Sequence, residues 1–280
     1  MPDALADEMC ARIGVARPVT MADLTAFYQA WTEQVPFDSI AKALALRECT
    51  RPPGADPVEF CDRWLATGVG GTCWGHVSAM AGLLGAAGFD CQVGLDRLLT
   101  DEFVDFHAFV VVVDGDRQWA LDVTHSSGDP LVVEAGAEGT HPAYPVSFEA
   151  DGDRLLHGYT SYSQTPGEPR WYAVLSTHLD AADVRTFCEI ARVHGMRAQS
   201  LYHRRFTRLE MIDGRPADDG GALIRRRVTT DGVSEDRFTD VDEAFAALGY
   251  GVGAVAMAER AGLIERSPAG AVRFVPRLPD

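Results

Sequence analysis

The sequence lacks any segment suited to crossing or entering a membrane. Its longest apolar run, around Ala108–Val113, is far too short to span a bilayer. The first residues, Met1–Glu8, are acidic and contain no apolar stretch of the kind found in secretory signals. We therefore predict no signal peptide and expect a cytoplasmic protein.

Positive charge and paired cysteines are also scarce. The formal net charge is −16 and Lys42 is the only lysine, which argues against nucleic acid or an anionic membrane as a general partner. None of the 6 cysteines forms a C-x-x-C pair, a pattern that fits a reducing compartment better than a disulfide framework. With 280 residues, 46% of them hydrophobic, the chain can bury large cores and form two or three subdomains.

The first third of the chain predicts helices. Thr20 and Asp23 have capping-box spacing ahead of an apolar stripe, and Asp56-Pro57 is typical of a helix start. A further helix is expected directly after Cys73, ending near Gly88.

After Gly88 the apolar residues alternate as they do in strands. The predicted strands are Cys91–Leu95, Phe106–Val113, Gln118–Val123, Trp171–Ser176, Tyr202–Met211 and Leu223–Thr229. Later helices are predicted at Asp180–His194, about Asp240–Leu248 and Ala254–Ile264. We expect an α+β protein.

A glycine-rich stretch, Gly68–Gly71, precedes Cys73 and suggests a tightly turned backbone before the helix. Free backbone N–H groups and the positive end of a helix dipole favour a thiolate at a helix N-terminus. Cys73 is therefore a candidate nucleophile, although a buried structural thiol would also fit this position.

A predicted hairpin supplies partners for such a nucleophile. A two-residue turn at Asp114-Gly115 would pair Val113 with Asp116 and would place His107 directly opposite Asp122. A four-residue turn, Asp114–Arg117, would offset His107 and Asp122 diagonally but leave them on one face. An aspartate beside a histidine fixes its tautomer and raises its basicity, so Cys73, His107 and Asp122 predict an activated thiol.

A metal site is the main alternative, because Cys73-x-x-His76 and Asp122-x-x-His125 both have ligand-like spacing. Zinc sites are usually richer in thiolates, so we predict no metal and expect His76 and His125 to line a pocket or to be structural. Arginines at 192, 197, 204, 205 and 208 form a basic stretch that is either a solvated face or a contact for phosphates.

These residues resemble the arylamine N-acetyltransferase family. The family hallmark, Arg-Gly-Gly-x-Cys-aromatic-Glu, is matched by Val69–Gly75, with Val69 and Gly75 replacing the arginine and the glutamate. The segments Pro36–Ser39, Asp105–Ala108 and Leu121–Val123 are similar to further family motifs, and Thr239–Gly251 resembles its terminal helix.

The resemblance implies three regions: a helical bundle over 1–89 carrying the cysteine, an antiparallel β-barrel over 90–190 carrying the histidine and aspartate, and an α/β lid over 191–280. The catalytic core would be like that of cysteine proteases and transglutaminases. It also implies ping-pong transfer of an acyl group from a thioester, usually acetyl-CoA, through Cys73 to an amine. No cofactor would be permanently bound, and acyl-CoA would be a co-substrate.

The resemblance also implies two groups of binding residues. The expected substrate pocket comprises Phe37, Trp74, Phe106, Thr124 and His125. The expected contacts for the acyl donor are Ser126, Ser127, Gly128, Arg204 and Arg205. The alternatives are an amide synthase that takes its acyl chain from a carrier protein, a hydrolase or transglutaminase-like enzyme with the same triad, and a non-catalytic binding protein.

Overall fold

The structure is a computed structural model that describes residues 1–48, 50, 53–99, 106–160, 169–179, 186, 200–267 and 272–276. The first third is helical, as predicted, with five helices: α1 (Asp3–Ile13), α2 (Met21–Gln34), α3 (Ile40–Arg47), α4 (Pro57–Thr67) and α5 (Cys73–Ala86). The first of these, α1, was not predicted from the sequence. The predicted capping box at Thr20 and Asp23 is formed, and the Asp56 side chain caps α4. None of the helices described is long and apolar enough to cross a membrane.

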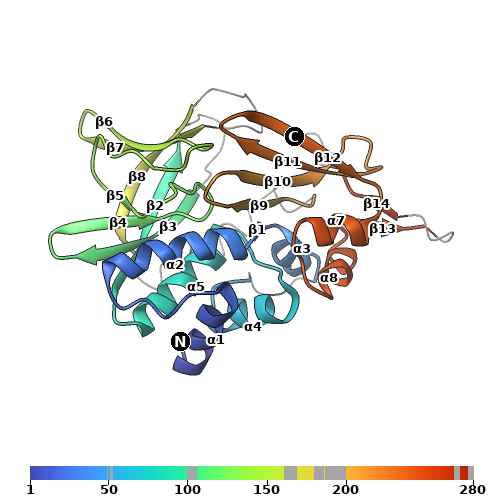
Figure 1. Ribbon diagram of the computed structural model, residues 1–280, viewed down its shortest axis with the longest axis horizontal. Helices are drawn as coiled ribbons and strands as arrows, with labels where there is room; N and C mark the ends of the chain where they lie inside the picture. Colours follow the sequence, from blue (N-terminus) through green and yellow to red (C-terminus); the bar gives the residue numbers. More distant parts are fainter. Residues whose placement is uncertain are drawn as a thin grey trace.

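The larger sheet has seven antiparallel strands, in the order β5-β4-β3-β2-β8-β7-β6. Their bounds are β2 (Asp90–Leu98), β3 (Phe106–Asp114), β4 (Arg117–Leu121), β5 (Leu131–Val132), β6 (Val146–Asp151), β7 (Arg154–Thr160) and β8 (Pro169–Leu179). β5 and β6 are the two ends of this strand order, and an antiparallel bridge between Glu138 and Ser147 joins β6 to the chain that follows β5. The sheet is curled into a half-barrel, where the resemblance implied a barrel. Figure 1 shows α2 and α5 lying beside β3 and β4.

A second sheet has five strands in the order β1-β9-β10-β11-β12. It combines β1 (Phe37–Asp38) with β9 (His203–Phe206), β10 (Met211–Pro216), β11 (Leu223–Thr229) and β12 (Gly232–Phe238). The helices α7 (Val241–Ala247) and α8 (Ala254–Arg260) follow, and β13 (Ile264–Arg266) pairs with β14 (Val272–Phe274). Figure 1 places α3 beside α7 and α8, next to this second sheet.

Several boundaries differ from the predictions. The single strand predicted at Tyr202–Met211 is two strands, β9 and β10, because a turn held by the Thr207 side chain separates them. The last predicted helix ends at Arg260 and is followed by strand β13. The helix predicted at Asp180–His194 lies outside the described residues, apart from Thr186.

The buried apolar side chains form three clusters. One joins α1, α2, α4 and α5 to the faces of β2 and β3 that carry Val93 and Val110. Another joins Ile40 of α3 to Val241 and Phe245 of α7. The third lies between the two sheets and contains Phe109 and Phe206. These clusters cross the boundaries predicted at residues 89 and 190, and the division into three domains stays a prediction.

The backbone ahead of α5 is tightly confined. A Cβ atom on Gly70 would lie 1.9 Å from the carbonyl oxygen of Pro36, so no larger residue fits without moving the chain. Gly85, in the last turn of the same helix, is exposed and has no heavy atom within 4 Å of the position where its Cβ would lie. Position 70 therefore has no room for a side chain, whereas position 85 can accept one.

We expect Gly70→Ala to lower the free energy of unfolding by about 1–3 kcal/mol, because the added methyl group must displace the Pro36 backbone. The matched control Gly85→Ala should raise it by about 0.5–1 kcal/mol, because alanine is a better helix former than glycine. Chemical denaturation followed by circular dichroism measures both. Equal stability of the two variants would contradict the close contact between Gly70 and Pro36.

Candidate active site

Cys73 is the first residue of α5, as predicted, with Thr72 at the N-cap. Its side chain is half-buried, whereas Cys10 and Cys61 are buried in the helical part of the chain. The first turn of a helix leaves backbone N–H groups without partners in the helix. The thiol therefore lies where a negative charge is favoured and where donors remain for a second anion.

The glycine loop is fixed by Asp38, which is fully buried. Its Oδ2 accepts a hydrogen bond from Gly70 N at 2.8 Å, and its backbone N–H donates to the Gly71 carbonyl at 2.9 Å. Arg63 of α4 donates to the Gly70 carbonyl at 3.0 Å and forms an ion pair with Glu59. Two residues from outside the hallmark motif thus hold the loop that carries Cys73.

Val69 and Gly75, which replace the charged residues of the family hallmark, are both buried. A Cβ on Gly75 would lie 3.1 Å from the Phe60 ring and 3.5 Å from Gly54 Cα. A long acidic side chain at position 75 would meet these atoms. The Arg63–Glu59 pair on α4 supplies charge near the loop in its place.

The hairpin register differs from the favoured prediction. Asp114 pairs with Arg117 and Val113 with Gln118, so the turn residues are Gly115 and Asp116. This is the diagonal arrangement that the sequence offered as the alternative. Moving the turn by one residue along the chain shifts the pairing of the two strands by two residues. Because side chains alternate between the faces with a period of two, His107 and Asp122 stay on the same face of the sheet.

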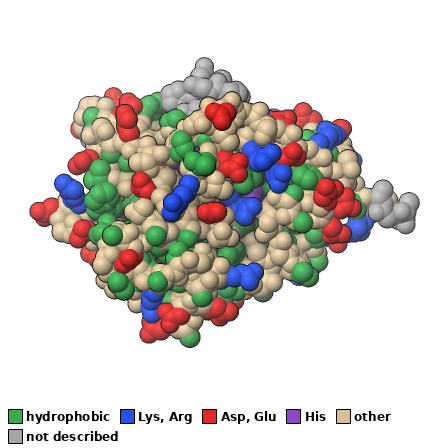
Figure 2. Space-filling view, viewed as in Figure 1, with side chains coloured by type: hydrophobic (Ala, Val, Ile, Leu, Met, Phe, Trp, Pro, Cys, Tyr) green, Lys and Arg blue, Asp and Glu red, His purple; other side chains and the backbone are tan. Residues whose placement is uncertain are grey.

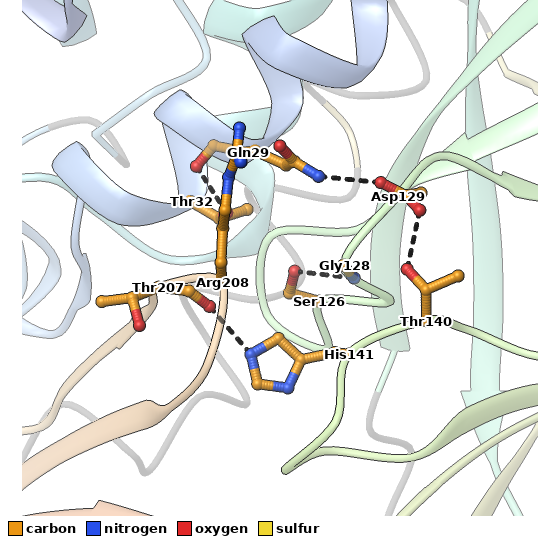
Figure 3. A pocket seen from close by; sticks show the side chains of 9 residues that line it. All are labelled: Gln29, Thr32, Ser126, Gly128, Asp129, Thr140, His141, Thr207 and Arg208. Carbon is orange, nitrogen blue, oxygen red and sulfur yellow. Dashed lines mark hydrogen bonds between the residues drawn. The ribbon is translucent and has the colours of Figure 1, made fainter. Parts of the chain in front are cut away.

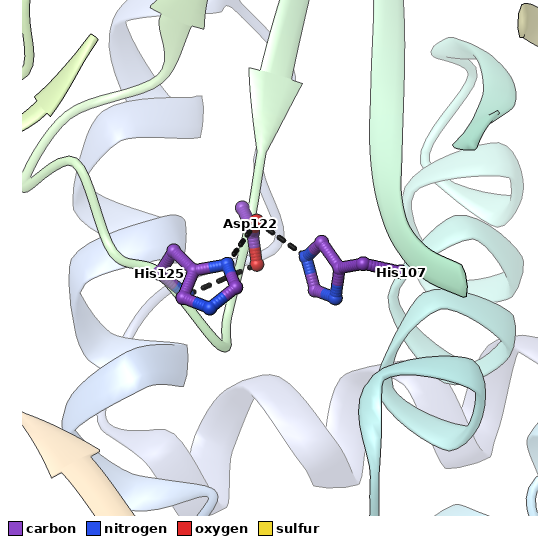
Figure 4. A group of neighbouring side chains, drawn as sticks. All are labelled: His107, Asp122 and His125. Carbon is purple, nitrogen blue, oxygen red and sulfur yellow. Dashed lines mark hydrogen bonds and ion pairs between the residues drawn. The ribbon is translucent and has the colours of Figure 1, made fainter. Parts of the chain in front are cut away.

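His107 Nε2 lies 2.6 Å from Asp122 Oδ2, and the two residues are only 5% and 3% exposed. Because a carboxylate can only accept, the imidazole donates from Nε2. The other oxygen, Oδ1, accepts from the backbone N–H groups of Thr124 at 2.8 Å and His125 at 3.1 Å. Asp122 is thus anchored by its own turn and directs one oxygen at His107, as Figure 4 shows.

This bond leaves Nδ1 of His107 as the atom able to accept a proton from Cys73. Burial opposes the charged imidazolium, but the charges of Asp122 and Asp96 and hydrogen bonds to Asp122 and Cys73 outweigh it, so the pKa of His107 lies well above its usual value. Burial likewise opposes a charged Asp122, but the two histidines hold the pKa of that carboxyl well below its usual range. Such an ion pair favours a charged imidazole beside the thiol.

His125 is a second imidazole on the same carboxylate. Its Nδ1 lies 3.3 Å from Asp122 Oδ2, and its ring stacks on Tyr159 with the ring centroids 3.6 Å apart. Burial outweighs the attraction of Asp122 and places the pKa of His125 well below its usual value. His107, Asp122 and His125 are close enough together to suit a cation, but the proton between His107 and Asp122 makes this a hydrogen-bonded site, and we assign no metal to it.

His76 has a structural role, which is one of the two roles that the sequence suggested for it. Its Nδ1 accepts from Trp31 Nε1 at 3.0 Å, and its Nε2 donates to the Pro36 carbonyl at 3.0 Å. Burial lowers the pKa of His76 to about 4, so the ring is neutral. Both nitrogens have partners, which rules out the alternative of a Cys73-x-x-His76 metal pair.

The expected pocket residues occupy different surroundings. Phe37 is half-buried and packs on Tyr202 with the ring centroids 5.8 Å apart. Trp74 belongs to the helical core. Thr124 is buried beside the triad, and its Oγ1 has no hydrogen-bond partner among the residues described. Phe106 begins β3, but its side chain lies outside the described part of the structure.

The expected donor contacts also separate. Ser126 and Gly128 line a pocket of about 190 Å³, shown in Figure 3, with Gln29, Asp129 and Arg208. Ser127 is instead used within the fold, since its hydroxyl donates to Asp129 O at 2.5 Å and its carbonyl accepts from Thr140 N and His141 N. The proposed catalytic side chains do not line this pocket.

Arg204 and Arg205 are neighbours on β9 and have different partners. Arg204 is buried, with its guanidinium 5.4 Å from the centre of the Tyr202 ring, and it donates to the Thr124 carbonyl at 3.4 Å. Its closest described carboxylate, Asp213, is 4.0 Å away and pairs with Arg215. Arg205 donates to the Glu33 carbonyl at 3.5 Å and is not brought to the triad.

Four polar residues near the site were not predicted from the sequence: Asp38, Arg63, Asp96 and His157. Asp96 and His157 form a buried pair, with Oδ2 and Nδ1 2.8 Å apart. Asp96 directly follows the predicted strand Cys91–Leu95 and lies within the longer observed strand β2. A carboxylate at the end of this apolar strand was the available signal for it. His157 falls outside the strands and helices named in the sequence analysis, and no local signal marked it.

Asp38 makes the stability of the loop depend on pH. Burial raises the pKa of Asp38 to about 7, from an ordinary value of 3.8. The folded protein therefore holds a proton that the unfolded chain releases between about pH 4 and pH 7, so stability falls as the pH rises through this range.

We expect this contribution to reach up to about 4 kcal/mol and to be absent in Asp38→Asn, which cannot ionise. Urea unfolding of the two proteins at several pH values between about 4.5 and 8 gives the difference in unfolding free energy. That difference should shrink as the pH rises and become constant above about pH 7. A difference independent of pH would contradict the assignment.

No protein-family model matches the chain, and no curated protein sequence matches it significantly. Solved structures do. The arylamine N-acetyltransferase from Mycobacterium marinum in complex with CoA is 16% identical, with a TM-score of 0.73 over 91% of this chain and 95% of that one. The Nocardia farcinica enzyme is 20% identical, with a TM-score of 0.68 over 87% and 88% of the two chains.

A Bacillus cereus arylamine N-acetyltransferase, which has a unique Cys-His-Glu catalytic triad, is 14% identical with a TM-score of 0.66 over 87% of this chain and 95% of that one. These likenesses cover nearly the whole of each chain at low identity. The chain therefore has the fold of the arylamine N-acetyltransferases.

Proposed function

We propose that the protein is a cysteine-dependent N-acyltransferase that moves an acyl group from acyl-CoA to an amine through Cys73. The observation that carries the proposal is the hydrogen-bonded pair of His107 and Asp122, 2.6 Å apart, beside a cysteine at a helix N-terminus. The fold of arylamine N-acetyltransferases supports the same function.

In the first half-reaction, His107 Nδ1 takes the proton of the Cys73 thiol. The thiolate attacks the carbonyl carbon of the thioester, and the carbonyl oxygen becomes an oxyanion. Backbone N–H groups in the first turn of α5 are the candidate donors to this oxyanion. When the C–S bond of the donor breaks, His107 returns its proton to the departing CoA thiolate, and an acyl-Cys73 thioester remains.

In the second half-reaction, the nitrogen of the amine attacks the acyl carbon. His107 accepts the proton that the nitrogen loses, the acyl–sulfur bond breaks, and the proton passes to Cys73. Asp122 stays ionised throughout and holds His107 in the tautomer that presents Nδ1. The free enzyme is thereby regenerated.

The proposed donor is acyl-CoA, because the Mycobacterium marinum arylamine N-acetyltransferase, which has the same fold, is known in complex with CoA. Figure 2 shows basic side chains gathered near the middle of one face, between acidic ones, although the chain carries a net charge of −16. Of the expected donor contacts, Ser126 and Gly128 line the pocket together with Arg208, whose guanidinium can meet an anionic group, whereas Arg204 is buried. The carrier-protein donor has no such support and stays a prediction.

The proposed acceptor is an aromatic amine. Phe37 forms a bridge with Gly71, two residues before Cys73, and both Phe37 and its neighbour Tyr202 are half-buried. Rings at the edge of the site favour a flat, apolar substrate. A hydrolase would differ in one observable, which is the release of free acid when no amine is present.

We expect intact-protein mass spectrometry to show one added acetyl group after mixing with acetyl-CoA, and none in Cys73→Ala. Cys91→Ala is a matched control, because Cys91 is also half-buried and burial raises the pKa of its thiol to about 12. This control should keep the adduct. A wild-type protein that gains no acyl group from any acyl-CoA tested would refute the proposal.

Asp122→Asn should lower turnover by about 10³–10⁴-fold, because the amide no longer enforces the His107 tautomer. Asp122→Glu should retain more activity than Asp122→Asn, since a glutamate completes the triad of the Bacillus cereus enzyme. Steady-state rates with one aryl amine test both variants. If Asp122→Asn turned over the amine as fast as Asp122→Glu and the wild-type protein, the carboxylate would have no part in the mechanism.

A further inference from the structure

Two histidines compete for one carboxylate in this site. Asp122 Oδ2 lies 2.6 Å from His107 Nε2 and 3.3 Å from His125 Nδ1. The centroids of the two imidazole rings are 4.6 Å apart. The mechanism needs the positive charge on His107, since this is the imidazole that exchanges a proton with Cys73. Some feature of the site must therefore decide which imidazole becomes charged.

Asp96 treats the two histidines unequally. The β2–β3 register places Asp96 directly opposite His107, and opposed residues in a sheet have their Cβ atoms about 4.5–5.5 Å apart. Asp96 is fully buried, and its Oδ1 has no hydrogen-bond partner among the residues described. Its Oδ2 accepts from His157 Nδ1 at 2.8 Å. Burial raises the pKa of Asp96, and the charges of His107 and His157 and the hydrogen bond to His157 oppose this rise. The ionised carboxylate attracts a proton toward His107 on the opposite strand.

His125 has no comparable second carboxylate among the described groups that act on it. The strongest effects on it come from Asp122, His107 and His157, and the rings that face it belong to Tyr144, Tyr159 and Tyr172. The surroundings of His107 are richer in negative charge. The titratable and aromatic groups that face it are Cys73 from α5, Asp96 from β2, Asp122 and His125 from the turn after β4, His157 from β7 and Tyr172 from β8.

We propose that Asp96 is a positioning residue. It makes His107, and not His125, the protonated imidazole beside Asp122. This inference deepens the proposed function, because a charged His107 is the partner that the Cys73 thiolate requires. The pair formed with His157 orients the Asp96 carboxylate and supplies it with one donor. The contrast between the two imidazoles agrees with the raised pKa of His107 and the lowered pKa of His125.

Histidine NMR in the absence of substrate tests the proposal without relying on turnover. In the wild-type protein labelled at the histidine rings, His107 should titrate at a higher pH than His125. In Asp96→Asn, which keeps the shape and an acceptor for His157, the pKa of His107 should fall toward that of His125. The matched control Asp213→Asn removes another buried carboxylate and should leave His107 unchanged, because Asp213 pairs with Arg215.

A second readout is the pH profile of Cys73 acylation by acetyl-CoA. With Asp96→Asn we expect the acylation rate near pH 7 to fall about tenfold, which corresponds to a decrease of one unit in the pKa of His107. Asp96→Glu, which restores the charge, should recover part of this rate. A uniform loss of rate at every pH would indicate a structural role and would overturn the proposal.

If Asp96→Asn does not fold, the wild-type titration alone decides. Titration of His125 at or above the pH of His107 would overturn the proposal, and so would an unchanged His107 in a folded Asp96→Asn. Because these measurements need no substrate, they stand even if Cys73 accepts no acyl group. A failed acylation with the expected titration would reject the proposed function and leave the role of Asp96 intact.

Discussion

The hydrogen bond between His107 and Asp122 is the interaction on which the site depends. It joins two ionisable side chains in the interior, where an unpaired charge would be very costly. Each partner makes burial of the other tolerable, and the turn after β4 fixes the carboxylate through two backbone N–H groups. The large sheet thereby holds His107, the proposed base, while a helix N-terminus carries Cys73, the proposed nucleophile.

The nucleophile depends on a second set of contacts, centred on the glycine loop. Asp38 accepts a hydrogen bond from the Gly70 N–H, and Arg63 donates one to the Gly70 carbonyl. Close packing against Pro36 leaves no room for a side chain at position 70. The charge that the family hallmark would place within the motif comes here from α4. Val69 and Gly75 bring no charge to this loop, and Arg63 of α4 donates to its backbone.

Much of this arrangement follows from local sequence patterns. Capping residues and apolar periodicity predicted the helices, and the position of Cys73 at a helix start was confirmed. The hairpin turn was placed one residue too early, because Asp-Gly and Gly-Asp are both acceptable turn pairs. Asp96, His157 and Arg63 could not be foreseen, since their roles arise from strand pairing and helix packing between residues distant in the chain. The barrel was inferred from family resemblance, and the observed sheet is a curled half-barrel.

The two-residue strand β1 has a consequence for motion. Phe37 bridges to Gly71 of the cysteine loop on one side and pairs with Arg204 of β9 on the other. The loop bearing the nucleophile and the C-terminal sheet are thus joined by backbone hydrogen bonding. That sheet cannot swing open as a free flap without separating β1 from one of its neighbours, so a hinge at this seam would break backbone hydrogen bonds beside the cysteine loop.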